Sequence, residues 1–285
     1  MTSLPYLLSA TPTASVSKRS QGPARWLFAA GTAAACVAAL SSLPAQAQSA
    51  APAADDNTTR FGIGAAVLSA NEGYRGAKSE TTLIPGLSIE NRWVRLFGPQ
   101  LDLKLAGNDA RTWWVGPRIE YRFDGYEADD SAFLSGMAER KGGVFAGIAG
   151  EFDLGNRFSL EFDVLRGGSE GGNERGRVAS LGLSRAYPSG AWTIVPRIGI
   201  EQASSSYVQY YYGVRASEAT AARRAYNGKS TTNWEFGVLV NYTVDRNQRL
   251  FANFNYERYG AGIKDSPIME KSGIPQVVFG YQYDF

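Results

Sequence analysis

Apolar and polar side chains alternate along most of this chain from Arg60 onward. The clearest run lies at the end, where every second residue is apolar and most residues between are polar or glycine. Because successive side chains of a β-strand point to opposite faces, this run predicts a strand with one apolar and one polar face. Val278 is the single apolar residue on the polar face. The apolar face consists of Val277, Phe279, Tyr281, Tyr283 and Phe285.

The same alternation recurs in segments of about 10–14 residues, the length of a tilted strand that crosses a bilayer, whereas strands of soluble proteins have about 5–6 residues. Two more strands are expected at 60–69 and 80–90. The stretch 92–106 is broken at Gly98-Pro99 and is interpreted as two short strands, which gives twelve strands in all, with ten as the alternative. The remaining segments are 111–124, 143–154, 157–167, 176–187, 191–203, 231–244, 248–260 and 275–285.

These strands predict an all-β fold, a single antiparallel transmembrane β-barrel of about twelve strands over residues 60–285. The C-terminal strand ending in Phe285 is expected to close the barrel against Phe61–Ser69, because an open sheet edge in hydrocarbon leaves backbone groups without partners. Connections in bacterial barrels are short on the periplasmic side and long on the outer side. The short ones here leave little periplasmic surface for a partner to grip. They lie at 155–156, 188–190 and 245–247, and the long ones at 125–142, 168–175, 204–230 and 261–274.

The first residues have the order of a secretory signal peptide. Lys18, Arg19 and Arg25 precede an apolar run over 26–40, and Ala45-Gln46-Ala47 offers small residues for a cleavage site. We therefore expect residues 1–47 to be a cleaved signal, 48–59 to be a flexible lead-in and the protein to reach the cell outer membrane. Cys36, the single cysteine, lies in the middle of the apolar run, where lipidation is disfavoured.

Composition narrows the function classes. The chain has no histidine, which removes His-based triads, His-ligated zinc and histidine acid–base catalysis, so we expect no enzyme, no catalytic or metal-binding residue and no cofactor. A net charge of +2 gives no reason to expect nucleic acid as a partner. The 32 glycines and the 12% of aromatic residues suit tight turns, close strand packing and interfacial aromatic girdles.

Two segments resemble the MltA-interacting protein (MipA)/OmpV family. The first is Tyr207–Val214, followed by Ser217–Ala221 and Ala225-Tyr226, which is similar to the family's YxxxYFGV, (S/T)xxxA and AY stretch. The second is Lys264–Glu270, which resembles the family's D-S-P-I-V-E loop before the final strand, with Met269 in place of valine. A looser match extends over about 60–285.

This resemblance implies an outer-membrane protein without known catalysis. The namesake of the family is described as a scaffold that joins a lytic murein transglycosylase to a murein synthase. The resemblance therefore implies possible periplasmic partners of the murein-synthesising machinery, besides the outer-membrane lipid and lipopolysaccharide that a barrel contacts.

Charged and polar clusters in the predicted outer loops have alternative interpretations. The carboxylates of Asp124, Glu127, Asp129 and Asp130 suit a calcium ion in type, but no twelve-residue ligand loop surrounds them, which favours a solvated or lipopolysaccharide-facing acidic loop. The segment Ser217–Tyr226 is predicted to form a short helix. The basic residues Arg140, Lys141, Arg223, Arg224 and Lys229 are candidates for lipopolysaccharide phosphates or for ordinary solvated charge.

Charged residues on the polar strand faces are expected to point into the barrel. Both signs occur, so they could pair and plug the lumen or line a narrow water-filled pore. Two functions remain open: a non-enzymatic envelope scaffold or interaction protein, and a narrow porin-like diffusion channel for small solutes. The residues are Arg118, Glu120, Arg122, Glu151, Asp153, Glu161, Asp163, Arg197, Glu201, Glu235 and Glu257.

Overall fold

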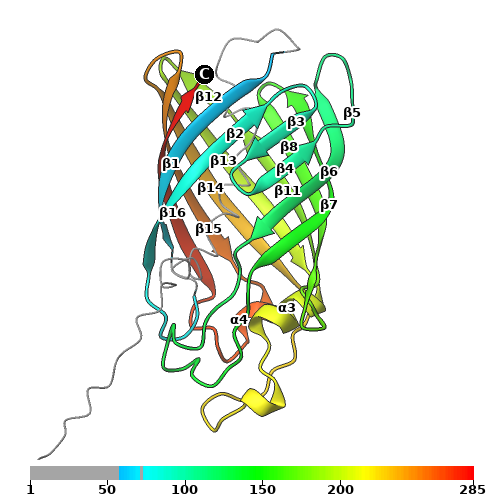
Figure 1. Cartoon of the computed structure of the whole chain (residues 1–285), viewed down its shortest axis with the longest axis vertical. Coiled ribbons are helices and arrows are strands. Elements are labelled where there is room, and N and C mark those ends of the chain that lie inside the picture. The colour runs from blue at the N-terminus through cyan, green and yellow to red at the C-terminus, as the bar shows by residue number, and fades with distance from the viewer. Residues whose placement is uncertain (1–57, 71–72) are drawn as a thin grey trace, which may run out of the picture.

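The alternating segments form a closed wall of antiparallel strands in the computed structural model, which describes residues 58–70 and 73–285 (Figure 1). The predicted signal, 1–47, and most of the predicted lead-in, 48–59, lie outside these residues. With β5 (Ala106–Gly107) counted as part of β4 and β12 (Tyr187–Ser189) as part of β11, the wall has twelve strands, which confirms the prediction of twelve over ten. The strands are β1 (Arg60–Ala70), β2 (Glu80–Glu90), β3 (Val94–Phe97), β4 (Gln100–Leu103), β6 (Trp113–Arg122), β7 (Gly143–Gly155), β8 (Phe158–Gly167), β11 (Arg177–Arg185), β13 (Trp192–Ala203), β14 (Thr231–Thr243), β15 (Gln248–Arg258) and β16 (Gly273–Asp284).

The barrel closes between its first and last strands, as predicted. β16 pairs with β1 in a register that runs from Gly62 opposite Asp284 to Ala70 opposite Gln276. Beyond the ladder, the backbone N–H of Phe285 donates to the carbonyl oxygen of Phe61 over 2.8 Å. The aromatic end of β16 therefore completes the ring of hydrogen bonds that the wall needs in hydrocarbon.

Short turns gather at one end of the barrel and long connections at the other (Figure 1). The β7–β8 turn is a two-residue hairpin with positive φ at both Asn156 (52°) and Arg157 (64°), the conformation that matches the twist of the flanking strands. The turn predicted at 188–190 lies at 190–191 instead, because β12 continues the strand to Ser189. By the rule for bacterial barrels, the end with the short turns faces the periplasm.

The long connections carry the remaining elements. The predicted helix over Ser217–Tyr226 is wrong, because only the 3₁₀ turn Ala216–Glu218 is helical there and Thr220 caps a tight turn by accepting from the N–H of Arg223. No helix within residues 58–70 and 73–285 is long and apolar enough to cross a membrane. The elements outside the wall are α3 (Ser205–Tyr212), α4 (Ala261–Lys264) and the hairpin of β9 (Ser169–Glu170) with β10 (Asn173–Glu174).

The apolar faces of the strands point outward. Phe279 and Phe236 are 55% and 45% exposed, as expected for side chains that contact lipid. Val278, the exception in the terminal pattern, is fully buried inside the barrel, where it belongs to an apolar cluster with Ala66 and Leu68. The lumen is therefore not polar throughout.

The β3–β4 hairpin is too short to span the wall. β3 pairs with β2 only from Ser88 to Glu90, and the hairpin turns at Gly98-Pro99. On the other side, β4 pairs with β6 only from Arg118 to Glu120. Among the described strands, none pairs with the edge of β2 between Glu80 and Gly86, so the wall is interrupted in its outer half (Figure 1).

The register makes a direct prediction for two neighbouring residues of β14. Val238 points outward and Gly237 points inward, so arginine at Val238 places a charge in hydrocarbon and should destabilise the barrel by about 2–4 kcal/mol. Arginine at Gly237 should cost less, because it enters a lumen that already holds carboxylates. Equilibrium unfolding in urea measures both values, and equal or reversed costs would show that the register is wrong by one residue.

Candidate functional site

Most of the charges predicted to face inward form ion pairs across the lumen. Asp153 does not, because it lies exposed at the β7–β8 turn and accepts from the N–H of Gly155, and Glu257 accepts from the side chain of Asn233. Arg118 makes a two-pronged contact with Asp102, with N–O distances of 2.6 and 3.0 Å. Arg122 donates to Asp124 over 2.9 Å and to Glu201 over 3.0 Å. Such charge-assisted bonds between buried side chains fix their geometry. These lumen arginines are therefore engaged with carboxylates, which favours the plug over the open pore.

Glu90, Arg95, Asp102 and Lys104 belong to this network but were not among the residues predicted to face inward. Arg95, on β3, donates to Glu151 over 2.9 Å, and Asp102, on β4, is fully buried. Both strands have only four residues, too few for the alternation to show a face by itself. In the structure Arg95 lies opposite Glu90 in the β2–β3 register, a pairing that the sequence does not show.

A lid covers the outer end of the lumen, and we use this term for residues 204–230. Its helix α3 is capped by Ser204, whose hydroxyl accepts from the N–H of Tyr207, and it buries Tyr207, Tyr211 and Tyr212. Tyr207 lies over Arg122, with 5.5 Å from the guanidinium carbon to the ring centroid. The space left between α3 and the lumen charges is about 30 Å³, room for only one or two waters.

The segments that carry the family resemblance build this lid together. The hydroxyl of Ser266 donates to the carbonyl oxygen of Tyr212 over 2.6 Å, and Ile268 is fully buried beside them. The hydroxyl of Tyr226 donates to the carbonyl oxygen of Gly262 over 2.9 Å. The 261–274 connection, which contains α4, thus holds the lid in place through these two hydrogen bonds.

An ion pair holds the centre of the lid. Arg140 donates to both carboxylate oxygens of Glu218 over 2.9 Å, and both side chains are buried. Burial acts to raise the pKa of Glu218, but hydrogen bonds from the N–H of Arg215, from Arg140 and from the N–H of Ala138 outweigh it, and the pKa is lowered. Arg223 donates to the carbonyl oxygens of Glu218 and Ser135.

This arrangement corrects part of the lipopolysaccharide prediction. Arg140 and Arg223 are consumed inside the lid and cannot reach a phosphate on the surface. Lys141, Arg224 and Lys229 are exposed, and for them the prediction stands untested.

The acidic cluster is divided. Asp124 pairs with Arg122 in the lumen, whereas the side chain of Asp130 accepts from the N–H of Glu127 over 2.7 Å in the loop. Partial burial, together with the carboxylates of Glu139 and Asp129, raises the pKa of Glu127. In the described part of the chain, no three carboxylate, cysteine or histidine side chains gather in a way that could hold a metal ion.

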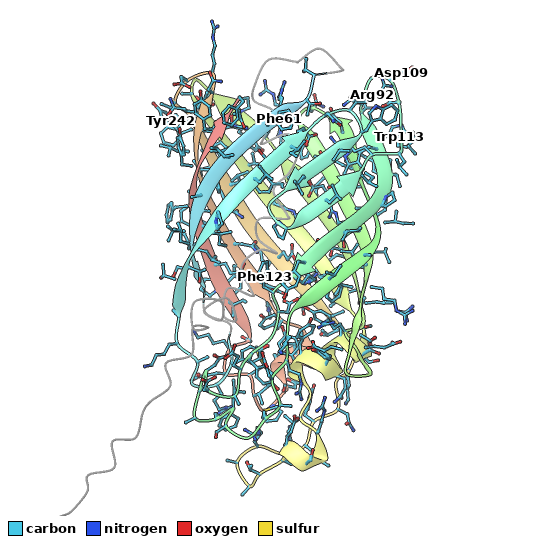
Figure 2. The ribbon with its side chains drawn as sticks, viewed as in Figure 1. Phe61, Arg92, Asp109, Trp113, Phe123 and Tyr242 are labelled. Carbon is cyan, nitrogen blue, oxygen red and sulfur yellow. The ribbon has the colours of Figure 1, made fainter. Side chains whose placement is uncertain are left out.

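A cavity of about 350 Å³ opens at the periplasmic end, within the size range of ligand sites. It lies between the β2–β3 turn, the 104–112 connection and the strands β6 and β7. Figure 2 shows Arg92, Asp109 and Trp113 at this end of the barrel. The cavity lining is aromatic and charged, and includes Trp93, Trp113, Trp114, Arg92, Lys104 and Arg111.

The aromatic side chains of this periplasmic cavity are held in place. The Asn91 side chain accepts from the N–H groups of Trp93 and Val94 over 2.8 Å each and so fixes the turn. The guanidinium of Arg92 lies 5.1 Å from the Trp93 ring centroid, and Arg95 lies equally close over Trp114. Trp93 is nevertheless 54% exposed.

The 104–112 connection gives this end more surface than the sequence indicated. Its first part, β5, pairs with β6, and Asn108 closes the loop by accepting from the N–H of Thr112 over 2.8 Å. Arg111 has a positive φ of 54°, which is uncommon for a residue other than glycine. The inference that periplasmic surface is scarce is therefore wrong at this connection. The sequence signal that could have indicated a longer periplasmic connection here is the pair Trp113-Trp114, which follows the turn-forming residues Gly107-Asn108-Asp109.

Comparison with known proteins agrees with the resemblance. A family model described as "MltA-interacting protein MipA" matches residues 63–285. Outer membrane protein Omp26La of Vibrio anguillarum is 27% identical over 52% of this chain and 56% of its own length. Outer membrane protein OmpV of Vibrio cholerae is 27% identical over 71% of this chain and 72% of its own length. The MltA-interacting protein of Escherichia coli K12 is 25% identical over 79% of this chain and 90% of its own length.

The lid ion pair predicts a pH dependence. Because the pKa of Glu218 is lowered in the folded lid, its ionised form stabilises the lid above the ordinary glutamate pKa of about 4.3, and this contribution is lost as the pH falls through the lowered value. Glu218→Gln should remove it at every pH and weaken the lid by about 3 kcal/mol, since Arg140 stays buried without its partner. Hydrogen exchange of 214–226, corrected for the pH dependence of the intrinsic rate, measures the effect.

The matched control is Glu127→Gln, which changes an outer-loop carboxylate that makes no contact with Arg140. It should leave exchange in 214–226 as in the wild type. Protection that stays high in Glu218→Gln at neutral pH would contradict a role for this ion pair in holding the lid.

Proposed function

Since the chain belongs to the MltA-interacting protein (MipA) family, we propose that it is a non-enzymatic envelope scaffold whose periplasmic end binds a murein-processing enzyme. The protein is an outer-membrane β-barrel, and its relatives are named as outer membrane or interacting proteins. A scaffold of this kind needs a rigid surface on the periplasmic side. The single observation that carries the proposal is the periplasmic cavity with its exposed Trp93, on a turn whose backbone is fixed by Asn91.

The chemistry of the cavity suits a protein partner. Tryptophan and arginine are the residues that most often dominate binding energy at interfaces, and Trp93 with Arg92 forms such a pair at the rim. The side chain of Asn91 fixes the turn in advance, so less conformational entropy is lost on binding. The family name supplies the class of partner, a lytic murein transglycosylase of the MltA type.

The alternative, a narrow diffusion channel, has less support. Conduction requires a water-filled path, whereas Arg118 and Arg122 are engaged with carboxylates across the lumen and α3 covers its outer end. The space at that end is about 30 Å³. We therefore expect no stepwise conductance from refolded protein in planar bilayers at neutral pH, and regular conductance steps would favour the channel instead.

The binding role predicts the effect of a single substitution. Barrel protein in nanodiscs, which expose both ends, is titrated with a purified soluble form of E. coli MltA, and binding is followed by biolayer interferometry. Trp93→Ala should weaken binding by about 2 kcal/mol, because it removes a large aromatic side chain from the rim of the cavity.

Trp234→Ala is the matched control, because this tryptophan is 47% exposed near the opposite end of the barrel. It should leave binding unchanged. Wild-type protein that does not bind MltA, or equal losses in the two variants, would contradict the proposal. Reduced membrane insertion of Trp93→Ala with unaltered binding would make Trp93 an interfacial anchor.

A further inference from the structure

The interruption in the wall beside the β3–β4 hairpin has two backbone edges that face each other. Gly98 donates its N–H to the carbonyl oxygen of Leu87, and Tyr121 donates its N–H to the carbonyl oxygen of Pro99. Toward the outer end of the barrel, these are the last backbone hydrogen bonds that join the hairpin to β2 on one side and to β6 on the other. Beyond them, within the described residues, β2 and β6 continue outward without a strand between them. We call this opening the wall gap.

The sequence is adapted to an uncovered edge at the wall gap. Backbone groups point to alternate sides along a strand, so Pro85 points the same way as Leu87, toward the gap. Proline has no N–H and is confined in sheets to edges and irregular positions. Its place here removes one donor that would otherwise face lipid without a partner. The sequence at this edge is therefore compatible with a strand that has no neighbour on this side.

An apolar groove lies on the inner side of the wall at the same place. Gly62, Gly64 and Gly86 have no side chains to fill it, and Phe97 and Phe251 line it from neighbouring strands. Gly86, Leu87 and Gly98 border both the groove and the wall gap. The open volume is about 30 Å³, so the groove is nearly closed as it stands.

Phe123 lies at the outer end of β6, the strand that forms one edge of the wall gap. It follows β6 directly, and Figure 2 labels it at this end of the strand. Its ring packs edge-on against Tyr121, 4.7 Å between centroids, and it joins Phe97 and Ile84 around the apolar cluster of the lumen. Moving this ring aside breaks no strand-to-strand hydrogen bond, because the ladder is absent here.

We propose that an acyl chain of an outer-membrane lipid enters the barrel laterally through the wall gap and lies in the apolar groove behind it. The choice of an acyl chain follows from the surroundings of the gap on the outer face of the barrel. Leu83 is 69% exposed on the outer face and Leu87 is 49% exposed, so the gap opens onto hydrocarbon. The groove offers an acyl chain mostly apolar surroundings, and its two polar side chains, Ser88 and Gln282, are already bonded to each other over 2.9 Å. Entry requires Phe123 to swing away, and the chain then occupies the space beside Gly86.

Lipid photolabelling tests the proposal. The full barrel is reconstituted into liposomes with a phospholipid that carries a diazirine at the middle of one acyl chain, irradiated, and digested for mass spectrometry. Labelling is expected on the inward residues Ile84, Phe97 and Phe251, besides the outward residues that all bilayer lipids touch. Labels confined to outward residues in the wild type would overturn the proposal.

Two substitutions and one control sharpen the result. Gly86→Leu should abolish labelling of the inward residues, and a Cβ at this position meets no atom closer than 3.7 Å, so the barrel should still fold. Phe123→Ala should increase that labelling. Gly237→Leu places the same side chain on the inner face of β14, away from the groove, and should change nothing.

Labelling of outward Phe279 should be equal in all variants, and heat-modifiable migration on gels confirms that each barrel is folded. Inward labelling that survives in folded Gly86→Leu would overturn the proposed path. A parallel sample with the same diazirine on a free fatty acid identifies the source. Inward labelling by the free fatty acid alone would overturn the assignment to a membrane lipid.

Discussion

The backbone hydrogen bond in a medium without water is the interaction on which this structure depends. Each N–H or C=O left unpaired in hydrocarbon costs several kcal/mol, so the wall must close on itself. The pairing of β1 with β16 meets that demand through a continuous register from Gly62 to Ala70. Closure in turn fixes which side chains face lipid and which face the lumen, because the pleat leaves no other choice.

Many of the side chains that face the lumen are charged, and their charges must be compensated inside the barrel. Arg118 with Asp102, and Arg122 with Asp124 and Glu201, bring opposite charges together inside the tube. The lid continues the same chemistry outside the wall, where Arg140 and Glu218 join segments far apart in the sequence. The lid thereby covers the outer end of the lumen.

The wall could be predicted from the sequence because a period of two residues is a local signal. It identified β16, its partner β1 and even the break at Gly98-Pro99, which became the hairpin tip. The lid and the periplasmic cavity could not be predicted in this way. Glu218 pairs with Arg140, and Trp93 lies beside the 104–112 connection. Both contacts join irregular segments, whose sequences show no periodicity. The false helix at Ser217–Tyr226 arose because residue propensity was used where such contacts decide.

The short hairpin also makes the barrel mechanically uneven. Three residue pairs join β2 to β3, from Ser88 to Glu90, whereas nine join β1 to β16. The junction between the first and last strands is thus stronger than the junction between β2 and β3. A lateral tension on the barrel, as in a bilayer that thins or curves, concentrates at the weaker joint. The first strands to part would then be β2 and its short neighbour, and the terminal strands would stay together.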